Sequence, residues 1–332
     1  MTTAMKRRQF IALLGGAAAS STSFRCMARA QQSAMPVIGF LRSTTLADSG
    51  YIVAAFREGL KEAGFVEGEN VKVEYRYADN QKERLTAMAL DLVREGVAVI
   101  VGNFEAARAA KQATTTTPIV FAFGGDPVQG GLVATLNRPG GNITGVTSLN
   151  STLGAKRLEL LHELVPNAAT LAMLVNPGSR TTDVERTEVE AAARAMGLQI
   201  AIQNVRSEDD IKAAFEGFKR NGAGGVLVGA GAFLNSYRER VVALAAQYGL
   251  PAGYNLRDFV VDGGLISYGP SITDTYRQAA IYTARILRGV QAADLPVMQS
   301  TKFEFAINLK TAKSLGLTVP LVMQMTADEV IE

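Results

Sequence analysis

Short apolar runs rich in β-branched residues alternate along the chain with longer segments whose apolar positions recur every three or four residues. The first run covers 37–41, and the first segment with helical spacing covers 48–63 and is closed by Gly64. Runs that stay apolar without alternation are typical of strands buried on both faces of a parallel sheet. In the first half we predict strands at 37–41, 71–77, 97–101, 119–123 and 143–147, and helices at 48–63, 83–94 and 105–113.

The same alternation restarts after residue 150 and continues to the end of the chain. We predict helices at 155–164, 183–196, 208–220, 236–248, 272–287 and 309–315, and strands at 170–175, 199–204, 225–228, 251–254, 265–268 and 303–307. Repeated strand–helix alternation indicates an α/β fold with two lobes, each built on a parallel sheet. We place the lobe boundary near 148–151 and a second crossing near 269–270. The N-terminal lobe then contains 31–149 and about 271–302, and the C-terminal lobe contains 150–270 and about 303–332.

The first 30 residues are typical of an export signal. Lys6, Arg7 and Arg8 form a basic start, an apolar run over 10–19 follows, and Ala28-Arg29-Ala30 offers small residues for cleavage before Gln31. The apolar run is shorter than the roughly 20 residues that cross a bilayer as a helix. The order Arg7-Arg8-Gln9-Phe10-Ile11 is similar to a twin-arginine signal. An ordinary secretory signal that carries two arginines is the alternative, and both routes predict a periplasmic protein.

Removal of this segment changes the charge and the thiol content of the chain. Of the 34 lysines and arginines, five lie in the segment, which leaves 29 against 31 acidic residues, a net charge of −2 instead of +3. No basic field remains for nucleic acid, so we expect no nucleic-acid partner. The single cysteine, Cys26, is removed as well, and Phe24-Arg25 before it does not suit lipidation. The mature chain therefore has no disulfide and no cysteine metal site.

Motifs for catalysis are missing from the chain. His162 is the only histidine and lies in an apolar predicted helix, where packing or surface exposure is its expected role. Neither G-x-S-x-G nor G-x-x-x-x-G-K-[ST] occurs. A glycine cluster at 222–231 does not fit G-x-G-x-x-G; it suits turns and close packing, or a backbone approached by a ligand. We therefore expect no catalytic residue, no metal and no cofactor.

Polar side chains follow most of the predicted strands. In open parallel sheets, ligands bind beyond the carboxyl ends of the strands. Small hydrogen-bonding groups with a few aromatic faces suit a polar organic molecule, and helix caps or turns are the alternative role of each. The candidate ligand-binding residues are Ser43, Thr44, Asn103, Phe123, Asp126, Asn176, Tyr254, Asn255, Ser267 and Tyr268.

Asp126 stands out among these candidates because it lies in the glycine-rich turn Gly124-Gly125-Asp126-Pro127. Glycines at both preceding positions let a ligand approach closely. The carboxylate would then hold a ligand ammonium through a charge-assisted hydrogen bond. The alternative role is an N-cap for the following helical turn.

Four longer stretches extend the analysis beyond single residues. They are TPIVFAFGGDPV at 117–128, NRPGGNITGV at 137–146, GGLISYG at 263–269 and NLKTAKSLG at 308–316. Together they resemble the substrate-binding proteins of ABC transporters that are related to tryptophan-binding receptors, over nearly the whole mature chain. The resemblance implies a type I periplasmic-binding fold with two Rossmann-like lobes, a hinge of crossing segments and closure around a ligand. It also implies ligand recognition by Asp126, Asn103 and Ser43.

We interpret the chain as a periplasmic solute-binding protein of an ABC importer that captures a small amino-acid-like or aromatic compound. Its expected partners are this small-molecule ligand and the permease subunits in the inner membrane, and we expect a monomer. One alternative is an exported two-domain enzyme that uses Asp126 with Tyr254 or Tyr268 as acid and base groups. Another is a ligand-sensing subunit of a membrane receptor.

The export signal generates a first prediction. The exported protein should begin near Gln31, and intact-mass analysis of periplasmic protein checks this. Replacing Arg7 and Arg8 together by Lys keeps the charge, yet it should retain the precursor inside the cell if the twin-arginine route is used. A periplasmic protein that still begins at Met1 would contradict cleavage, and normal export of the double variant would leave the ordinary secretory route.

Overall fold

Two sheets organise the chain. The computed structural model describes residues 35–148, 153–177 and 180–332, so the predicted signal segment with Cys26 and residues 149–151 of the predicted lobe boundary lie outside the described residues. All elements below belong to one compact unit, Pro36–Glu332. The strands of the first sheet are β1 (Val37–Arg42), β2 (Lys72–Tyr77), β3 (Val99–Gly102), β4 (Ile119–Gly124), β5 (Ile143–Ser148) and β11 (Met298–Ser300).

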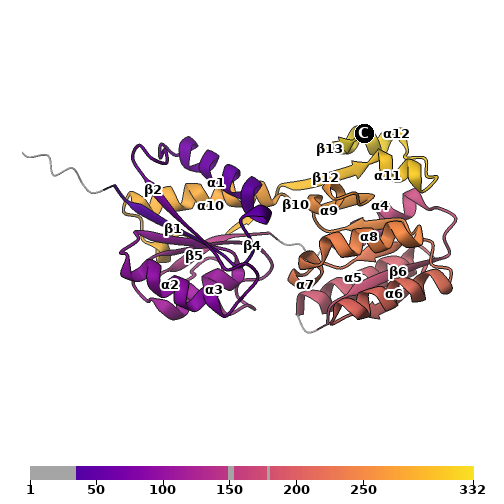
Figure 1. Cartoon of the computed structure of the whole chain (residues 1–332), viewed down its shortest axis with the longest axis horizontal. Helices are drawn as coiled ribbons and strands as arrows, with labels where there is room; N and C mark the ends of the chain where they lie inside the picture. Colours follow the sequence, from indigo (N-terminus) through magenta and orange to yellow (C-terminus); the bar gives the residue numbers. More distant parts are fainter. Residues whose placement is uncertain (1–34, 149–152, 178–179) are drawn as a thin grey trace, which may run out of the picture. The chain divides into compact units, whose positions relative to one another are not determined.

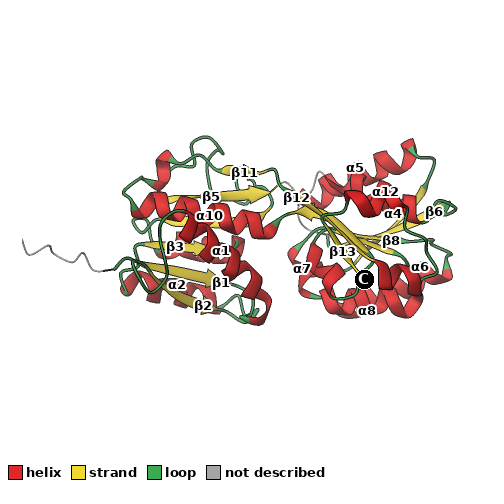
Figure 2. Ribbon diagram, turned by 90° about the horizontal axis from the view of Figure 1, so that it is seen from above, coloured by secondary structure: helices red, strands yellow, loops and turns green. Residues whose placement is uncertain are grey.

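The first sheet is parallel throughout and is covered by helices on both faces. Its strand order is β11-β5-β4-β3-β1-β2. Figure 2 shows β11 beside β5 at one edge. Figure 1 shows α1 and α10 along one face, with α2 and α3 along the other. These helices are α1 (Gly50–Glu62), α2 (Arg84–Arg94), α3 (Phe104–Ala113) and α10 (Ile272–Leu287).

Alternate side chains of each strand enter the two cores of this lobe. Phe40 packs with residues of α1 and α10, whereas its neighbour Leu41 packs with residues of α2 and α3. Both positions are fully buried. Burial on both faces explains why these strands are apolar at consecutive positions instead of every second one.

The second sheet contains one antiparallel pair. Its order is β13-β12-β10-β9-β8-β6-β7, and β10 and β12 are antiparallel, whereas the other pairs are parallel. The predicted α/β class with two mainly parallel sheets is therefore confirmed, with β12 as a departure. Its strands are β6 (Thr170–Val175), β7 (Gln199–Asn204), β8 (Val226–Val228), β9 (Ala252–Tyr254), β10 (Ile266–Pro270), β12 (Phe303–Asn308) and β13 (Glu329–Ile331).

The antiparallel pair has a topological cause. The end of β10 pairs with the start of β12, Pro270 with Phe303. Between them the chain supplies α10 and β11 to the first lobe, so it leaves the second sheet and returns to it at the same edge. Two neighbouring strands that share an exit and an entry edge must run in opposite directions.

Helices also cover both faces of the second sheet. One core joins the sheet to α6 (Glu208–Arg220), α7 (Ala232–Ser236), α8 (Arg238–Tyr248) and α9 (Arg257–Val261). The other joins it to α4 (Gly154–Leu164), α5 (Arg180–Ala195), α11 (Leu309–Ser314) and α12 (Leu321–Thr326). The single helix predicted at 236–248 is wrong at its start, because Tyr237, with ψ of 20°, separates α7 from α8.

The segments that pass between the sheets are bonded to one another. Ser271, which follows β10, caps α10 by accepting a hydrogen bond from the Asp274 amide at 3.1 Å. Its own amide donates to the Lys302 carbonyl at 2.9 Å, and its hydroxyl donates to Glu304 Oε1 at 2.5 Å. Lys302 lies between β11 and β12, so two of the crossing connections are held together. Within the described residues, no helix is long and apolar enough to span a membrane.

The packing of α1 against α10 generates a second prediction. A Cβ added at Gly59 would collide with the backbone oxygen of Arg277 and lie 2.9 Å from the Ala280 Cβ, whereas one at Gly50 meets nothing within 4 Å. Gly59→Ala should lower the free energy of unfolding by about 1–3 kcal/mol through overpacking. Gly50→Ala, in the same helix and at φ −56°, should be neutral or stabilising by up to about 1 kcal/mol. Urea denaturation of both variants measures the difference, and equal effects would contradict the close packing.

Candidate functional site

Two predicted site residues meet at the carboxyl edge of the first sheet. Ser43 follows β1 and Asn103 follows β3, and Asn103 Nδ2 donates to Ser43 Oγ at 2.6 Å. The other amide atom, Asn103 Oδ1, accepts from the Ala106 amide at 3.3 Å and caps α3. Thr44 lies beside them, with its Oγ1 3.2 Å from Ser49 Oγ. Hydroxyl and amide groups of neighbouring loops therefore cluster at this edge.

A buried arginine that the sequence analysis missed lies at the same edge. Arg42 is the last residue of β1 and is 7% exposed. Its guanidinium donates to the Tyr276 hydroxyl and, at 3.3 Å, to Thr44 Oγ1. Its central carbon lies 5.2 Å from the centroid of the Tyr276 ring. The only signal in the sequence was one basic residue directly after an apolar run, and that position is usually exposed.

Three tyrosines lie within electrostatic range of Arg42. Burial raises the pKa of Tyr276 and of Tyr77, and the Arg42 charge lowers both to a smaller extent. Desolvation of the Tyr51 hydroxyl raises its pKa, the negative charge of Asp258 raises it further, and Arg42 lowers it. Tyr51 donates to Asp258 Oδ2 at 2.6 Å. The surroundings of Arg42 are therefore aromatic rings and neutral hydroxyl groups.

Asp126 makes the hydrogen bonds of a cap. Its Oδ1 accepts from the amides of Val128 at 2.8 Å and Gln129 at 3.1 Å, which is the geometry of the alternative role considered above. Phe123 lies in an aromatic cluster, with its ring centroid 5.0 Å from that of Phe104. Phe123 lies near the end of β4 and Asp126 follows this strand, so both lie at the same carboxyl edge of the first sheet as Ser43 and Asn103.

Three candidates in the second lobe have clear packing or turn roles. Asn176 Nδ2 donates to the Val205 carbonyl at 2.7 Å, which ties the ends of β6 and β7 together. Tyr254 is 1% exposed and its ring stacks on Phe259 with centroids 4.7 Å apart. Burial raises its pKa well above the ordinary range. Tyr268 stacks on Phe303 with centroids 6.1 Å apart.

Asn255 and Ser267 differ from these residues because their polar atoms lack partners. Both residues are buried, at 0% and 1% exposure. Among the described residues, Asn255 Nδ2, Asn255 Oδ1 and Ser267 Oγ have no hydrogen-bond partner. A buried polar group without a partner costs about 1–3 kcal/mol, so such groups are uncommon outside functional sites. Asn255 follows β9 and Ser267 lies within β10, and these two strands are adjacent in the second sheet.

A buried ion pair supports this edge of the second sheet. The side chains of Arg157 in α4 and Glu185 in α5 are each 1% exposed. The Arg157 guanidinium donates a charge-assisted hydrogen bond to Glu185 Oε1. Glu185 Oε2 also accepts from the Ala230 amide at 2.8 Å, and Arg157 donates to the Tyr268 carbonyl at 3.3 Å. Burial raises the pKa of Glu185, while the Arg157 charge and the Ala230 amide lower it. The pair thus fixes the loop after β8 and the backbone of β10.

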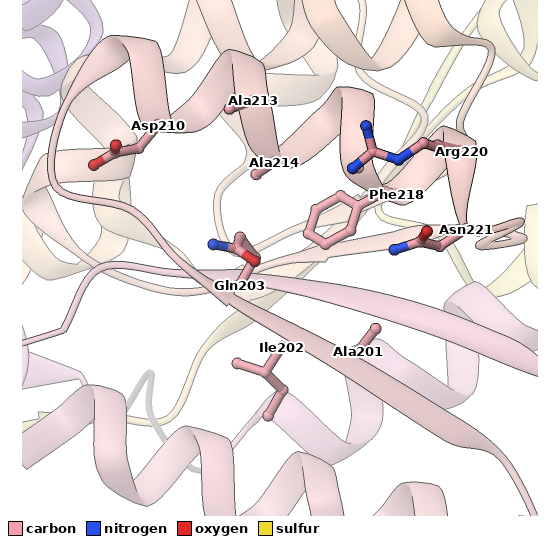
Figure 3. A pocket seen from close by; sticks show the side chains of 10 residues that line it. Ala201, Ile202, Gln203, Asp210, Ala213, Ala214, Phe218, Arg220 and Asn221 are labelled. Carbon is pink, nitrogen blue, oxygen red and sulfur yellow. The ribbon is translucent and has the colours of Figure 1, made fainter.

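A cavity elsewhere in the second lobe contains none of the predicted residues. It has a volume of about 250 Å³ and lies between β7 and α6 (Figure 3). Asp210 on its wall is occupied by the capping box of α6, where the amides of Arg206 and Ser207 donate to its Oδ2. The Arg206 amide is the main cause of the lowered pKa of Asp210. In the part of the chain that the structure describes, no group of three or more His, Cys, Asp or Glu residues is placed to hold a metal ion.

Comparison with known proteins gives one consistent family. The family model described as ABC transporter substrate binding protein matches residues 41–331. A tyrosine-binding protein of Clostridioides difficile strain R20291 is 25% identical over 264 residues, which cover 79% of this chain and 75% of that protein.

Solved structures agree with this result. The ABC domain from Streptococcus pneumoniae in complex with L-Trp is 26% identical, with a TM-score of 0.79 over 89% of this chain and 99% of that chain. A conserved domain protein from Vibrio cholerae is also 26% identical, with a TM-score of 0.78 over the same shares. Two sugar-bound binding proteins at 14% and 13% identity have TM-scores of 0.56 and 0.57, a likeness of fold alone. The predicted type I periplasmic-binding fold is confirmed.

The buried ion pair generates a third prediction. Glu185→Gln leaves the Arg157 cation buried without its carboxylate, so the free energy of unfolding should fall by about 3–5 kcal/mol. The matched control is Glu159→Gln, which breaks the exposed pair of Glu159 with Lys156 in α4. That change should cost less than about 1 kcal/mol. Guanidinium chloride denaturation compares the two, and a loss below 1 kcal/mol at Glu185 would contradict the supporting role of the pair.

Proposed function

Because the chain belongs to the family of ABC transporter substrate-binding proteins, we propose that it is the periplasmic receptor of an ABC importer. In this proposal it captures a small amino-acid-like or aromatic compound and delivers it to the permease subunits in the inner membrane. The ligands named for the relatives, tyrosine and L-Trp, support this class of compound. The receptor acts as a monomer, is exported by its N-terminal signal and catalyses no reaction.

The unpartnered polar atoms of Asn255 and Ser267 carry the proposal within this chain. A folded protein keeps such groups buried and unpaired when a ligand satisfies them on binding, because the gain is then realised in the complex. They lie at the edge where open α/β sheets bind ligands. A protein that only packs these residues would pair them internally, as it pairs Asn176.

The proposed site takes hydrogen-bonding groups from both lobes. Ser43, Thr44 and Asn103 contribute from the first, and Asn255 and Ser267 from the second. Phe123 and Tyr268 offer aromatic faces to the ligand, and Asp126 offers the carboxylate oxygen that does not take part in its cap. Asn176 and Tyr254 make internal contacts, with the Val205 carbonyl and the Phe259 ring, and in this proposal they do not contact the ligand.

Ligand capture requires the two lobes to move as separate bodies. We place the N-terminal lobe at 31–149 with about 271–302 and the C-terminal lobe at 150–270 with about 303–332. Hinge closure about the crossing segments is the expected motion, because few bonded connections resist it. The hydrogen bonds of Ser271 to Lys302 and Glu304 connect two of these segments, so we expect the two segments to move together.

The proposed function generates a fourth prediction. The mature protein, unfolded and refolded to remove cargo, should bind L-tyrosine, L-tryptophan or a related compound in calorimetric titration. At one hundred times the dissociation constant the ligand should add about 2.7 kcal/mol to the free energy of unfolding. Mass spectrometry of molecules released from the native protein identifies the physiological compound. Conversion of the bound compound into a product would favour the exported enzyme instead.

A pair of asparagine variants tests the site in the same titration. Asn255→Ala should weaken binding by at least about tenfold, because it removes the donor and acceptor that the ligand pairs. Asn176→Ala should leave affinity unchanged and lower the free energy of unfolding by about 1 kcal/mol, because its bond is internal. Unchanged affinity in Asn255→Ala would remove this residue from the site.

A further inference from the structure

Arg42 carries a buried positive charge without a negative partner. The residue is 7% exposed, and the hydrogen-bond acceptors of its guanidinium are the neutral hydroxyls of Tyr276 and Thr44. Its Nε has no partner among the described residues. An arginine side chain does not lose its proton in proteins, so the charge persists at this position.

Arg157, which is also buried, shows how a buried arginine is usually neutralised. Arg157 is paired with Glu185, and both side chains are 1% exposed. In the described ranges, no carboxylate oxygen lies within the 4.0 Å of an ion pair from the Arg42 guanidinium. Burial of an unpaired charge is strongly unfavourable, and removal of one partner from a buried pair costs about 3–5 kcal/mol. Arg42 therefore resembles one half of such a pair.

Asp258, which is bonded to Tyr51, and Asp274, which lies in α10 with Tyr276, are both bonded to groups other than Arg42. Asp258 accepts the hydrogen bond of the Tyr51 hydroxyl at 2.6 Å. Asp274 accepts from Arg277 at 3.0 Å and from Ser300 at 3.2 Å. The buried ring of Tyr276 lies over the Arg42 guanidinium, and Tyr51 and Tyr77 lie within its electrostatic range; the low polarity of a buried ring strengthens electrostatic attraction to an anion.

We propose that Arg42 binds the carboxylate group of the ligand, so that the cargo of this receptor is an organic acid or an amino acid and not a sugar or an amine. The guanidinium presents a planar set of donors that matches a carboxylate, and Arg42 lies at the same strand edge as Ser43 and Asn103. The inference rests on the proposed function and adds the chemical class of its ligand. In the empty site the Arg42 cation has no negative partner. The ion pair forms only when the carboxylate of the ligand enters.

The experiment uses the refolded mature protein and a thermal-shift panel. The panel contains the L-amino acids, L-tyrosinamide, L-tryptophanamide, tyramine, phenylacetate, neutral sugars and the molecules released from the native protein. Compounds that shift the melting temperature are titrated by calorimetry into the wild type and into Arg42→Gln, Arg42→Lys and Arg76→Gln. Arg76, in the neighbouring strand β2, is the matched control because it is paired with Glu74 and Glu95.

The expected result is that only carboxylates bind and that their amides do not. Arg42→Gln should weaken binding by about 10- to 150-fold, the loss of one charge-assisted pair. Arg42→Lys should fall between this variant and the wild type, because lysine keeps the charge and loses the planar fork. Arg76→Gln should bind as the wild type does. Without ligand, Arg42→Gln should melt at the same temperature as the wild type or above it, since it removes an unpaired charge.

Four outcomes overturn the inference. Binding of sugars or amines as the only hits would keep the proposed function and refute the carboxylate. Equal affinity of a carboxylate for the wild type and Arg42→Gln would refute the role of Arg42 alone. A large drop in melting temperature of ligand-free Arg42→Gln would assign Arg42 a structural role. If no member of the panel binds the wild type, the proposed function itself fails, and the inference fails with it.

Discussion

Burial of both sheets on both faces governs where this protein can hold polar chemistry. Consecutive side chains of a strand such as β1 enter two different cores, as Phe40 and Leu41 do, so these positions are closed to water and ligand. Polar groups that a ligand can reach are therefore expected where strands end and the helix layers diverge. Ser43, Asn103 and Asn255 all occupy such ends, and the hydrogen bond between Ser43 and Asn103 forms because parallel neighbours end at the same edge. The site is thus a consequence of the layered fold more than of any sequence motif.

Arg42 and Arg157 are both buried, but their charges are balanced in different ways. Arg157 lies deep among helices, and Glu185 neutralises it, so the pair serves as fixed support for the backbone of β10 and the loop after β8. Arg42 lies at a strand end among hydroxyls and rings, where no carboxylate of the described chain is paired with it. A balanced charge holds structure in place, whereas an unbalanced one raises the energy of the empty state and favours complex formation.

Periodicity predicted most of the architecture, because long elements contain several repeats of their period. The long helices and most strands of both sheets were found this way, and the family resemblance indicated the fold that the structural comparisons confirm. Some of the shortest elements, such as β11, β13 and α9, were missed, since they contain too few positions for a period. Arg42 was missed because its significance depends on Tyr276, which lies 234 residues away in sequence. Likewise, whether Asn255 is paired depends on the tertiary structure around it, which single-residue chemistry does not reveal.

The return of α10 to the first lobe has a consequence for the order in which the protein is made. The buried face of α1 is completed by α10, and Arg277 reaches Glu62 across 215 residues of intervening chain. When the first half of the chain has left the ribosome, the core of the first lobe therefore still lacks α10. Contacts of such long sequence separation slow folding and leave apolar surface exposed while synthesis continues. Most helices and strands of the second lobe are synthesised before α10. We therefore expect the second lobe to fold before the first, although its synthesis begins later.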